Sequence, residues 1–163
     1  MAKKQDVIYV TDQDMTNQKE EGYYCIKNWV AQEWLPIIGM TGIGLYNIYL
    51  SAADADRGNS WFFSIRTLSE YTFISKNTIV LHNWLLEICG LISIESGTNG
   101  YTNEYTILDP PRVTPDLLKK IVAILEVPAD VGQTRQRFKQ RVIDRINLWK
   151  PISACVRIPQ YQR

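Results

Sequence analysis

The sequence has very few of the residues from which metal and nucleophilic sites are usually built. It contains one histidine, His82, and three widely spaced cysteines that form no C-x-x-C motif. One imidazole cannot make a multi-histidine metal site, and three scattered thiols fit neither a disulfide scaffold nor a structural zinc site. We therefore expect a cytoplasmic protein with reduced thiols, no bound metal and no other cofactor.

Catalytic and phosphate-binding motifs are also missing. Residues 54–58 (DADRG) resemble the start of a calcium loop, but the glycine falls one position early. Residues 39–44 (GMTGIG) lack the Lys-Ser/Thr pair of a P-loop. His82 and Cys89 both fall in an apolar helical segment, where we expect a structural histidine and an inert thiol. The sequence predicts a protein that is not an enzyme.

Charge is balanced over the whole chain but divided along it. The net charge is +1, yet residues 1–109 carry a net −6 and residues 110–163 a net +7. This asymmetry predicts that the two parts meet different partners, or each other.

Twenty consecutive residues, 34–53, lack any formal charge. This length could span a bilayer, but the segment contains Pro36 and three glycines and is flanked by Glu33 and Asp54. We predict a buried helix, no membrane partner, and a core face formed by Leu45, Ile48 and Tyr49.

The order of elements follows from periodicity and capping residues. Helices are expected over 41–53, 65–71 and 76–89, the last two starting after Ser64 and Ser75, with Gly90 ending the third. Strands are expected over 91–95 and 101–108, joined by the glycine-containing turn 96–100. Two further helices are expected, over 115–125 and 133–150.

Residues 67–95 (TLSEYTFISKNTIVLHNWLLEICGLISIE) resemble the winged helix-turn-helix domains of bacterial regulators and of phage and plasmid replication proteins. The matching positions are Thr67, Leu68, Ser75, Thr78, Ile79, Leu86, Gly90, Leu91 and Ile92. The resemblance implies three helices and a two-stranded wing, with the third helix entering the DNA major groove.

The resemblance also implies a set of DNA contacts around the start of the third helix. These are Arg66, Thr67, Ser75, Lys76, Asn77 and Thr78. Hydroxyls and free N–H groups at a helix start suit phosphate oxygens, while Asn77 and Lys76 suit base edges. Ser75 and Thr78 have a second interpretation, in which they only cap the helix.

The third helix departs from the family on its outer face, which is apolar where Arg, Lys or Gln is usual. We expect this face to be covered, by the C-terminal helices or by a second copy of the chain. The predicted interface residues are Val80, Leu81, Trp84, Leu85 and Ile88. The wing, residues 96–103, likewise contains no Lys or Arg.

The segment 133–150 carries arginines at helical spacing beside an apolar stripe, namely Arg137, Arg141 and Arg145. Three interpretations stay open for this stripe: contact with DNA phosphates, pairing with the acidic N-terminal half, or simple solvation. A membrane-surface helix is less compatible with it, because packing needs the apolar stripe.

Together these observations predict an α+β, mostly α, protein. We expect an arm at 1–35, a winged helix-turn-helix domain at 36–109 and a basic helical extension at 110–163. The predicted function is double-stranded DNA binding, as a transcriptional regulator or replication-initiation factor. The alternative is an interaction module that binds a protein, or a second copy in a homodimer, through the apolar face of the third helix.

Overall fold

The computed structural model describes residues 26–53, 60–97, 103–128 and 132–151. Within these ranges the elements are α2 (Asn28–Ala52), β1 (Ser60–Phe62), α3 (Ile65–Thr72), α4 (Lys76–Ile88), β2 (Ile92–Glu95), β3 (Glu104–Ile107), α5 (Pro115–Glu126) and α6 (Gln133–Asn147). The predicted class, α+β with mostly helix, is confirmed.

Two serines start the central helices as their sequence positions predict. The Ser64 hydroxyl accepts a hydrogen bond from the Thr67 N–H at the start of α3, and the Ser75 hydroxyl accepts one from the Thr78 N–H at the start of α4. Each bond satisfies an N–H group that has no partner within its own helix. Gly90, at φ 71°, follows α4 in the left-handed conformation expected of it.

The strands form one antiparallel sheet in the order β1-β3-β2. Thr106 of β3 lies between Ser60 of β1 and Ser93 of β2 in the register. The apolar residues 61–63 (WFF) predict an extended segment, but nothing in the sequence predicts its pairing with β3. The sequence also predicts short strands at 7–10 and 23–26. These strands and the predicted turn 96–100 fall wholly or mainly outside the described residues.

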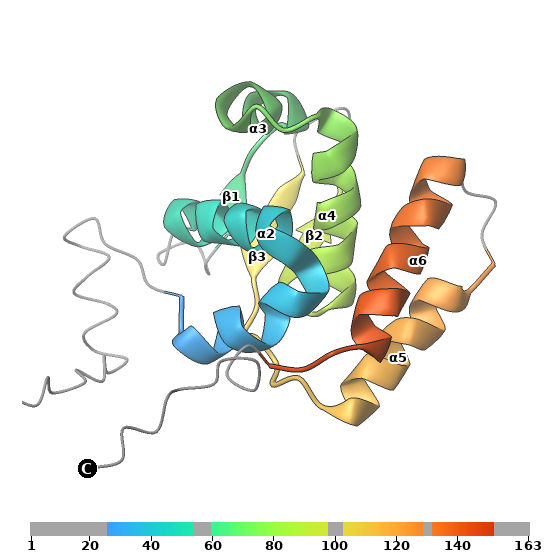
Figure 1. Ribbon diagram of the computed structural model, residues 1–163. Coiled ribbons are helices and arrows are strands. Elements are labelled where there is room, and N and C mark those ends of the chain that lie inside the picture. Colours follow the sequence, from blue (N-terminus) through green and yellow to red (C-terminus); the bar gives the residue numbers. More distant parts are fainter. Residues whose placement is uncertain (1–25, 54–59, 98–102, 129–131, 152–163) are drawn as a thin grey trace, which may run out of the picture.

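The core lies between the sheet and the crossed helices α2 and α4 (Figure 1). Tyr49 of α2 stacks on Trp61 of β1 and Tyr105 of β3, with ring centroids 4.8 and 5.7 Å away. The Tyr49 hydroxyl donates to the side-chain carbonyl of buried Asn83 in α4. This bond explains how a polar residue is accommodated on the inward face of α4.

The N-terminal section of α2 contacts residues that follow β3 and a residue that follows α6. The Trp34 indole donates to the Pro111 carbonyl at 3.0 Å, and the Trp149 indole donates to the Glu33 carbonyl at 2.9 Å. Glu33 also pairs with Arg112 at 2.6 Å. The predicted boundary between residues 35 and 36 therefore falls inside a helix, and residues 28–35 join the core through Val30 and Trp34.

α2 is long and apolar enough to cross a membrane by length and composition. Nine of its residues are nevertheless buried within the fold, among them Trp34, Leu45 and Tyr49. The helix is interrupted at Gly39, where φ is 71° and ψ is 176°. That backbone conformation is essentially restricted to glycine.

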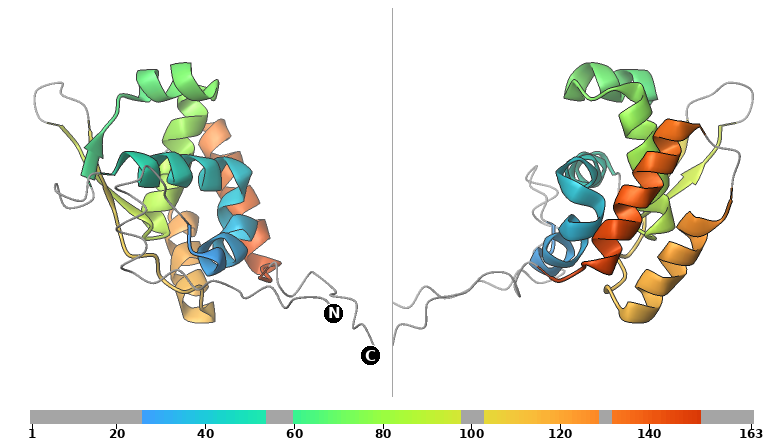
Figure 2. Two further views of the ribbon diagram at one scale, coloured as in Figure 1. Left: turned by 90° about the vertical axis from the view of Figure 1, so that its left-hand side faces the viewer. Right: turned by 45° about the vertical axis from the view of Figure 1, so that its right-hand side comes forward.

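α6 lies beside α4 in Figures 1 and 2, and it packs on α2 and on α5. α3, the start of α4 and the start of α6 lie at the same end of the molecule in all three views. This end therefore brings the start of α6 near α3 and the start of α4, which precede it by more than fifty residues in sequence.

We expect Gly39→Ala to lower the free energy of unfolding by about 1–3 kcal/mol, because alanine is strained at this φ and ψ. Its Cβ would also lie 3.2 Å from the Arg145 Nη1. Gly44→Ala is the matched control, since Gly44 is exposed in the same helix with open space around it. The control should gain about 0.5–1 kcal/mol. Urea unfolding measures both; equal effects would contradict the role of Gly39.

Candidate functional site

α4 is buried on two opposite sides. At 100° per residue, Ile79, Asn83 and Leu86 share the face that packs on the core, and all three are buried. Leu81 and Leu85 lie about 150° around the helix from that face and are also buried, at 8% and 0% exposure. Something must therefore cover the side of α4 that faces away from the core.

That cover is α6. His82 and Trp84 flank Leu81 and Leu85 around α4, and both contact α6. The His82 ring meets the Phe138 ring edge-on at 5.1 Å, and the Arg135 guanidinium lies 4.4 Å from the centre of the Trp84 ring. The sequence predicted that either the C-terminal helices or a second copy of the chain would cover this face. In the structure a C-terminal helix of the same chain covers it.

This burial corrects the predicted interface residues. Leu81 and Leu85 are enclosed within the chain and are not accessible to a partner. Trp84 and Ile88 are half-buried, and Val80 is 50% exposed. Val80 is the most accessible residue of the predicted set.

Two further cations on α6, Lys139 and Arg135, have packing roles. Lys139 is 6% exposed, and its ammonium group donates to the Val127 carbonyl at 3.1 Å and lies 5.9 Å from the Trp84 ring. Arg135 stacks on the same ring from one turn earlier. Cations over an indole face are stabilised by its quadrupole, so these charges hold α6 on α4. A tryptophan within an apolar helix face was the sequence signal for this contact.

The predicted arginine stripe divides into two parts. Arg145 donates to the Ile37 carbonyl at 3.5 Å, beside the interruption at Gly39. Carbonyls at a helix end lack intrahelical partners and attract cations, which explains this contact. Arg145 is itself exposed, like Arg137 and Arg141. Because its guanidinium has this partner within the fold, we expect it to be less available to DNA than the other two arginines.

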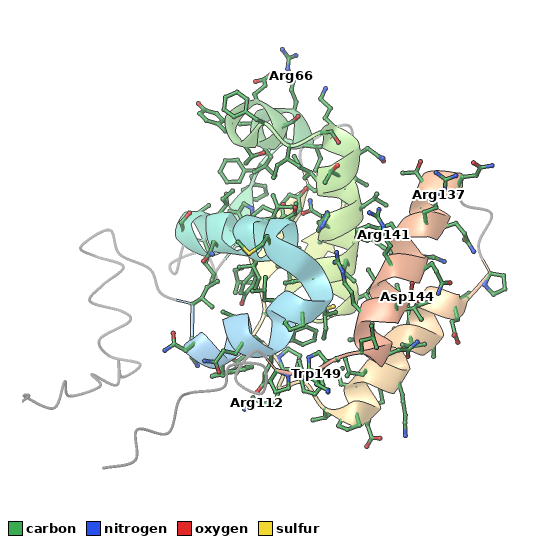
Figure 3. All side chains as sticks on the ribbon, in the orientation of Figure 1. Arg66, Arg112, Arg137, Arg141, Asp144 and Trp149 are labelled. Carbon is green, nitrogen blue, oxygen red and sulfur yellow. The ribbon has the colours of Figure 1, made fainter. Side chains whose placement is uncertain are left out.

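Arg137 and Arg141 are exposed on α6 (Figure 3). Neither forms an ion pair with any residue of the described ranges. The nearest carboxylate on the helix, Asp144, accepts a hydrogen bond from Gln140 at 2.9 Å. Pairing with the acidic N-terminal half is therefore not observed among the described residues for these two arginines.

The predicted contacts on α3 and at the start of α4 lie on the surface. Lys76 and Asn77 are exposed, and Arg66 is exposed in an i, i+4 pair with Glu70 at 2.8 Å. Thr67 and Thr78 share hydrogen bonds with Ser64 and Ser75, so both have capping roles. Figure 3 places Arg66 and Arg137 on α3 and α6, toward the end of the molecule where α4 begins.

His82 sits at the edge of the α4–α6 contact. Its Nδ1 hydrogen-bonds the Thr78 carbonyl at 2.9 Å. Burial lowers the pKa of His82 and the nearby charges of Arg145 and Arg141 lower it further, against the opposing effect of the Thr78 hydrogen bond. The neutral imidazole is therefore the form that fits against α6.

Cys89 is fully enclosed at the end of α4, and burial raises the pKa of its thiol. A buried thiol held in the protonated form is a poor nucleophile. Among the described residues, no group of three His, Cys, Asp or Glu side chains is arranged to hold a metal ion.

Searches of family models, curated proteins and solved structures find no match for this chain.

We expect the free energy of unfolding to fall as the pH is lowered from 7 toward 5.5. The unfolded state binds a proton at His82 near pH 6.5, whereas the folded state, with a lowered pKa, does not. The loss is about 1.4 kcal/mol for each unit between the two pKa values. His82→Gln should flatten this part of the profile, which urea unfolding at a series of pH values measures; an unchanged slope in the variant would contradict the assignment.

Proposed function

We propose that this chain is a non-enzymatic, cytoplasmic DNA-binding protein of the winged helix-turn-helix type, a transcriptional regulator or replication-initiation factor. The order of α3, α4 and the β2–β3 hairpin supports the fold. β1, paired to β3, supplies the third strand of the sheet beside the helices.

One observation carries the proposal of DNA binding. Exposed cations from three elements lie toward one end of the molecule: Arg66 of α3, Lys76 of α4 and Arg137 of α6. Asn77 is next to Lys76 in sequence, and Arg141 lies about one turn further along α6. Arg137 and Arg141 keep their full charge available, since no described carboxylate pairs with them. Such a surface attracts the phosphate backbone and releases its counterions.

The position of α6 determines how a duplex can approach. α6 covers Leu81 and Leu85, on the side of α4 away from the core, so α4 cannot lie along the major groove through that side. The first turn of α4 stays accessible, and in helix-turn-helix proteins the N-terminal residues of this helix contact the bases. We infer end-on docking, with Lys76 and Asn77 toward the bases and Arg137 and Arg141 on the backbone.

Salt dependence tests the proposal. Duplex binding measured by fluorescence anisotropy should weaken steeply between about 50 and 200 mM salt. Arg137→Ala and Arg141→Ala should each weaken binding and reduce the slope of log K against log salt by about 1, because each removes one phosphate contact.

Arg145→Ala is the matched control on the same helix. It should reduce the salt slope less than Arg141→Ala does while lowering the melting temperature, since the exposed Arg145 also donates to the Ile37 carbonyl. No binding of wild-type protein at the lowest salt would overturn the proposal. A slope that falls as much for Arg145→Ala as for Arg141→Ala would overturn the assignment of contacts.

A further inference from the structure

The connection between α3 and α4 presents two aromatic side chains to solvent. Tyr71, in the last turn of α3, is 81% exposed, and Phe73, directly after the helix, is 96% exposed. Two residues apart, their Cα atoms lie within about 7 Å of each other. Single exposed apolar side chains are common on proteins, but adjacent large aromatics at the tip of a motif are not explained by folding.

Phe73 also has an unfavourable backbone conformation. Its φ of 57° and ψ of 17° are left-handed, and it is the one non-glycine residue with positive φ among the described residues. Bulky side chains rarely adopt this conformation, and the same chain uses glycine at Gly39 and Gly90. Only three residues, 73–75, separate α3 from α4, so one of them has to reverse the chain direction.

Folding alone would favour glycine at position 73. The Phe73 ring is almost fully exposed, so removing it would cost little packing and would relieve the backbone. Strained residues of this kind concentrate at functional sites, where the side chain serves a ligand. The ring therefore needs an external partner to account for its presence.

The neighbouring residues indicate the chemistry of that partner. Lys76 follows Phe73 by three positions, so their Cα atoms lie within about 11 Å, and Lys76 is exposed. Ser75 and Asn77, also exposed, add hydrogen-bonding groups. Aromatic faces beside cations are what unpaired nucleotides bind, with bases on the rings and phosphates on the charges. The centre of a protein interface, by contrast, is depleted of charge.

We propose that Tyr71 and Phe73 form a stacking site for unpaired bases, next to the duplex contacted by Lys76, Arg137 and Arg141. The proposal rests on the DNA-binding function proposed above. It specifies the DNA ligand as a junction between single-stranded and double-stranded DNA. The open ring faces accept any base, so the site is indifferent to sequence.

Two DNA probes test this site: a blunt duplex, and the same duplex with a single-stranded extension containing 2-aminopurine. Wild-type protein should bind the extended probe more tightly and change the 2-aminopurine fluorescence as the base stacks. Phe73→Gly should bind the extended probe about tenfold more weakly, leave blunt-duplex affinity unchanged, and abolish the fluorescence change. Phe73→Trp, which keeps a ring, should retain binding and the fluorescence change.

Phe73→Gly should also raise the melting temperature, so loss of fold cannot explain its loss of binding. Leu148→Ala is the control for an exposed apolar side chain outside the site, since Leu148 is 80% exposed beyond the far end of α6, and it should alter neither probe.

The possible failures are distinguishable. If wild-type protein binds neither probe, the proposed DNA-binding function fails and the stacking site with it. If both probes bind equally and Phe73→Gly changes neither, the stacking site alone is overturned. An equal loss on both probes assigns the ring to duplex contact and overturns the preference for unpaired bases. A lower melting temperature for Phe73→Gly overturns the strain argument.

Discussion

The fold depends on α4 being enclosed from two sides. Its core face meets α2 and the sheet through Ile79, Asn83 and Leu86, and its opposite face is closed by α6 at His82 and Trp84. α6 packs through its buried apolar residues Phe138, Val142 and Ile146, and three of its cations find partners in the fold other than carboxylates. The Trp84 ring and the Val127 and Ile37 carbonyls are those partners.

This arrangement explains why the charge of the C-terminal segment is not all available for a ligand. Of the α6 cations, Arg135, Lys139 and Arg145 have partners elsewhere in the fold, although Arg145 is itself exposed. Arg137 and Arg141 are exposed and form no ion pair among the described residues. A net charge counted along the sequence does not separate these uses, because both kinds of cation occur on the same helix with the same spacing. Position relative to α2 and α4 is what separates them.

Local signals in the sequence predicted most of the helices and the strands, because caps and periodicity act over a few residues. Ser64, Ser75 and Gly90 mark the helix ends where they were expected. The boundary predicted at residue 36 falls inside α2 for a physical reason. Trp34 contacts Pro111 and Glu33 contacts Val113, 77 and 80 positions away, and such long-range contacts leave no local sequence pattern.

The candidate site could be predicted in part for the same reason. The exposure of Lys76 and Asn77 follows from their place at a helix start, and burial of the outer face of α4 follows from its composition. The division of the arginine stripe depends on Gly39 and on Arg145, 106 positions later in the chain. Phe73 was missed because an aromatic residue before a helix suggests burial, although the absence of glycine between α3 and α4 was a signal that some side chain has to adopt positive φ.

The interruption of α2 at Gly39 has a geometric consequence for the most apolar segment of the chain. It divides the helix into sections of about 11 and 13 residues, which rise only about 16 and 20 Å. The hydrocarbon core of a bilayer is about 30 Å thick, so neither straight section reaches across it. The segment has the composition of a membrane span, but a single glycine with positive φ divides it into two short helical sections that both contribute residues to the protein core. The Ile37 carbonyl beside this interruption accepts a hydrogen bond from Arg145.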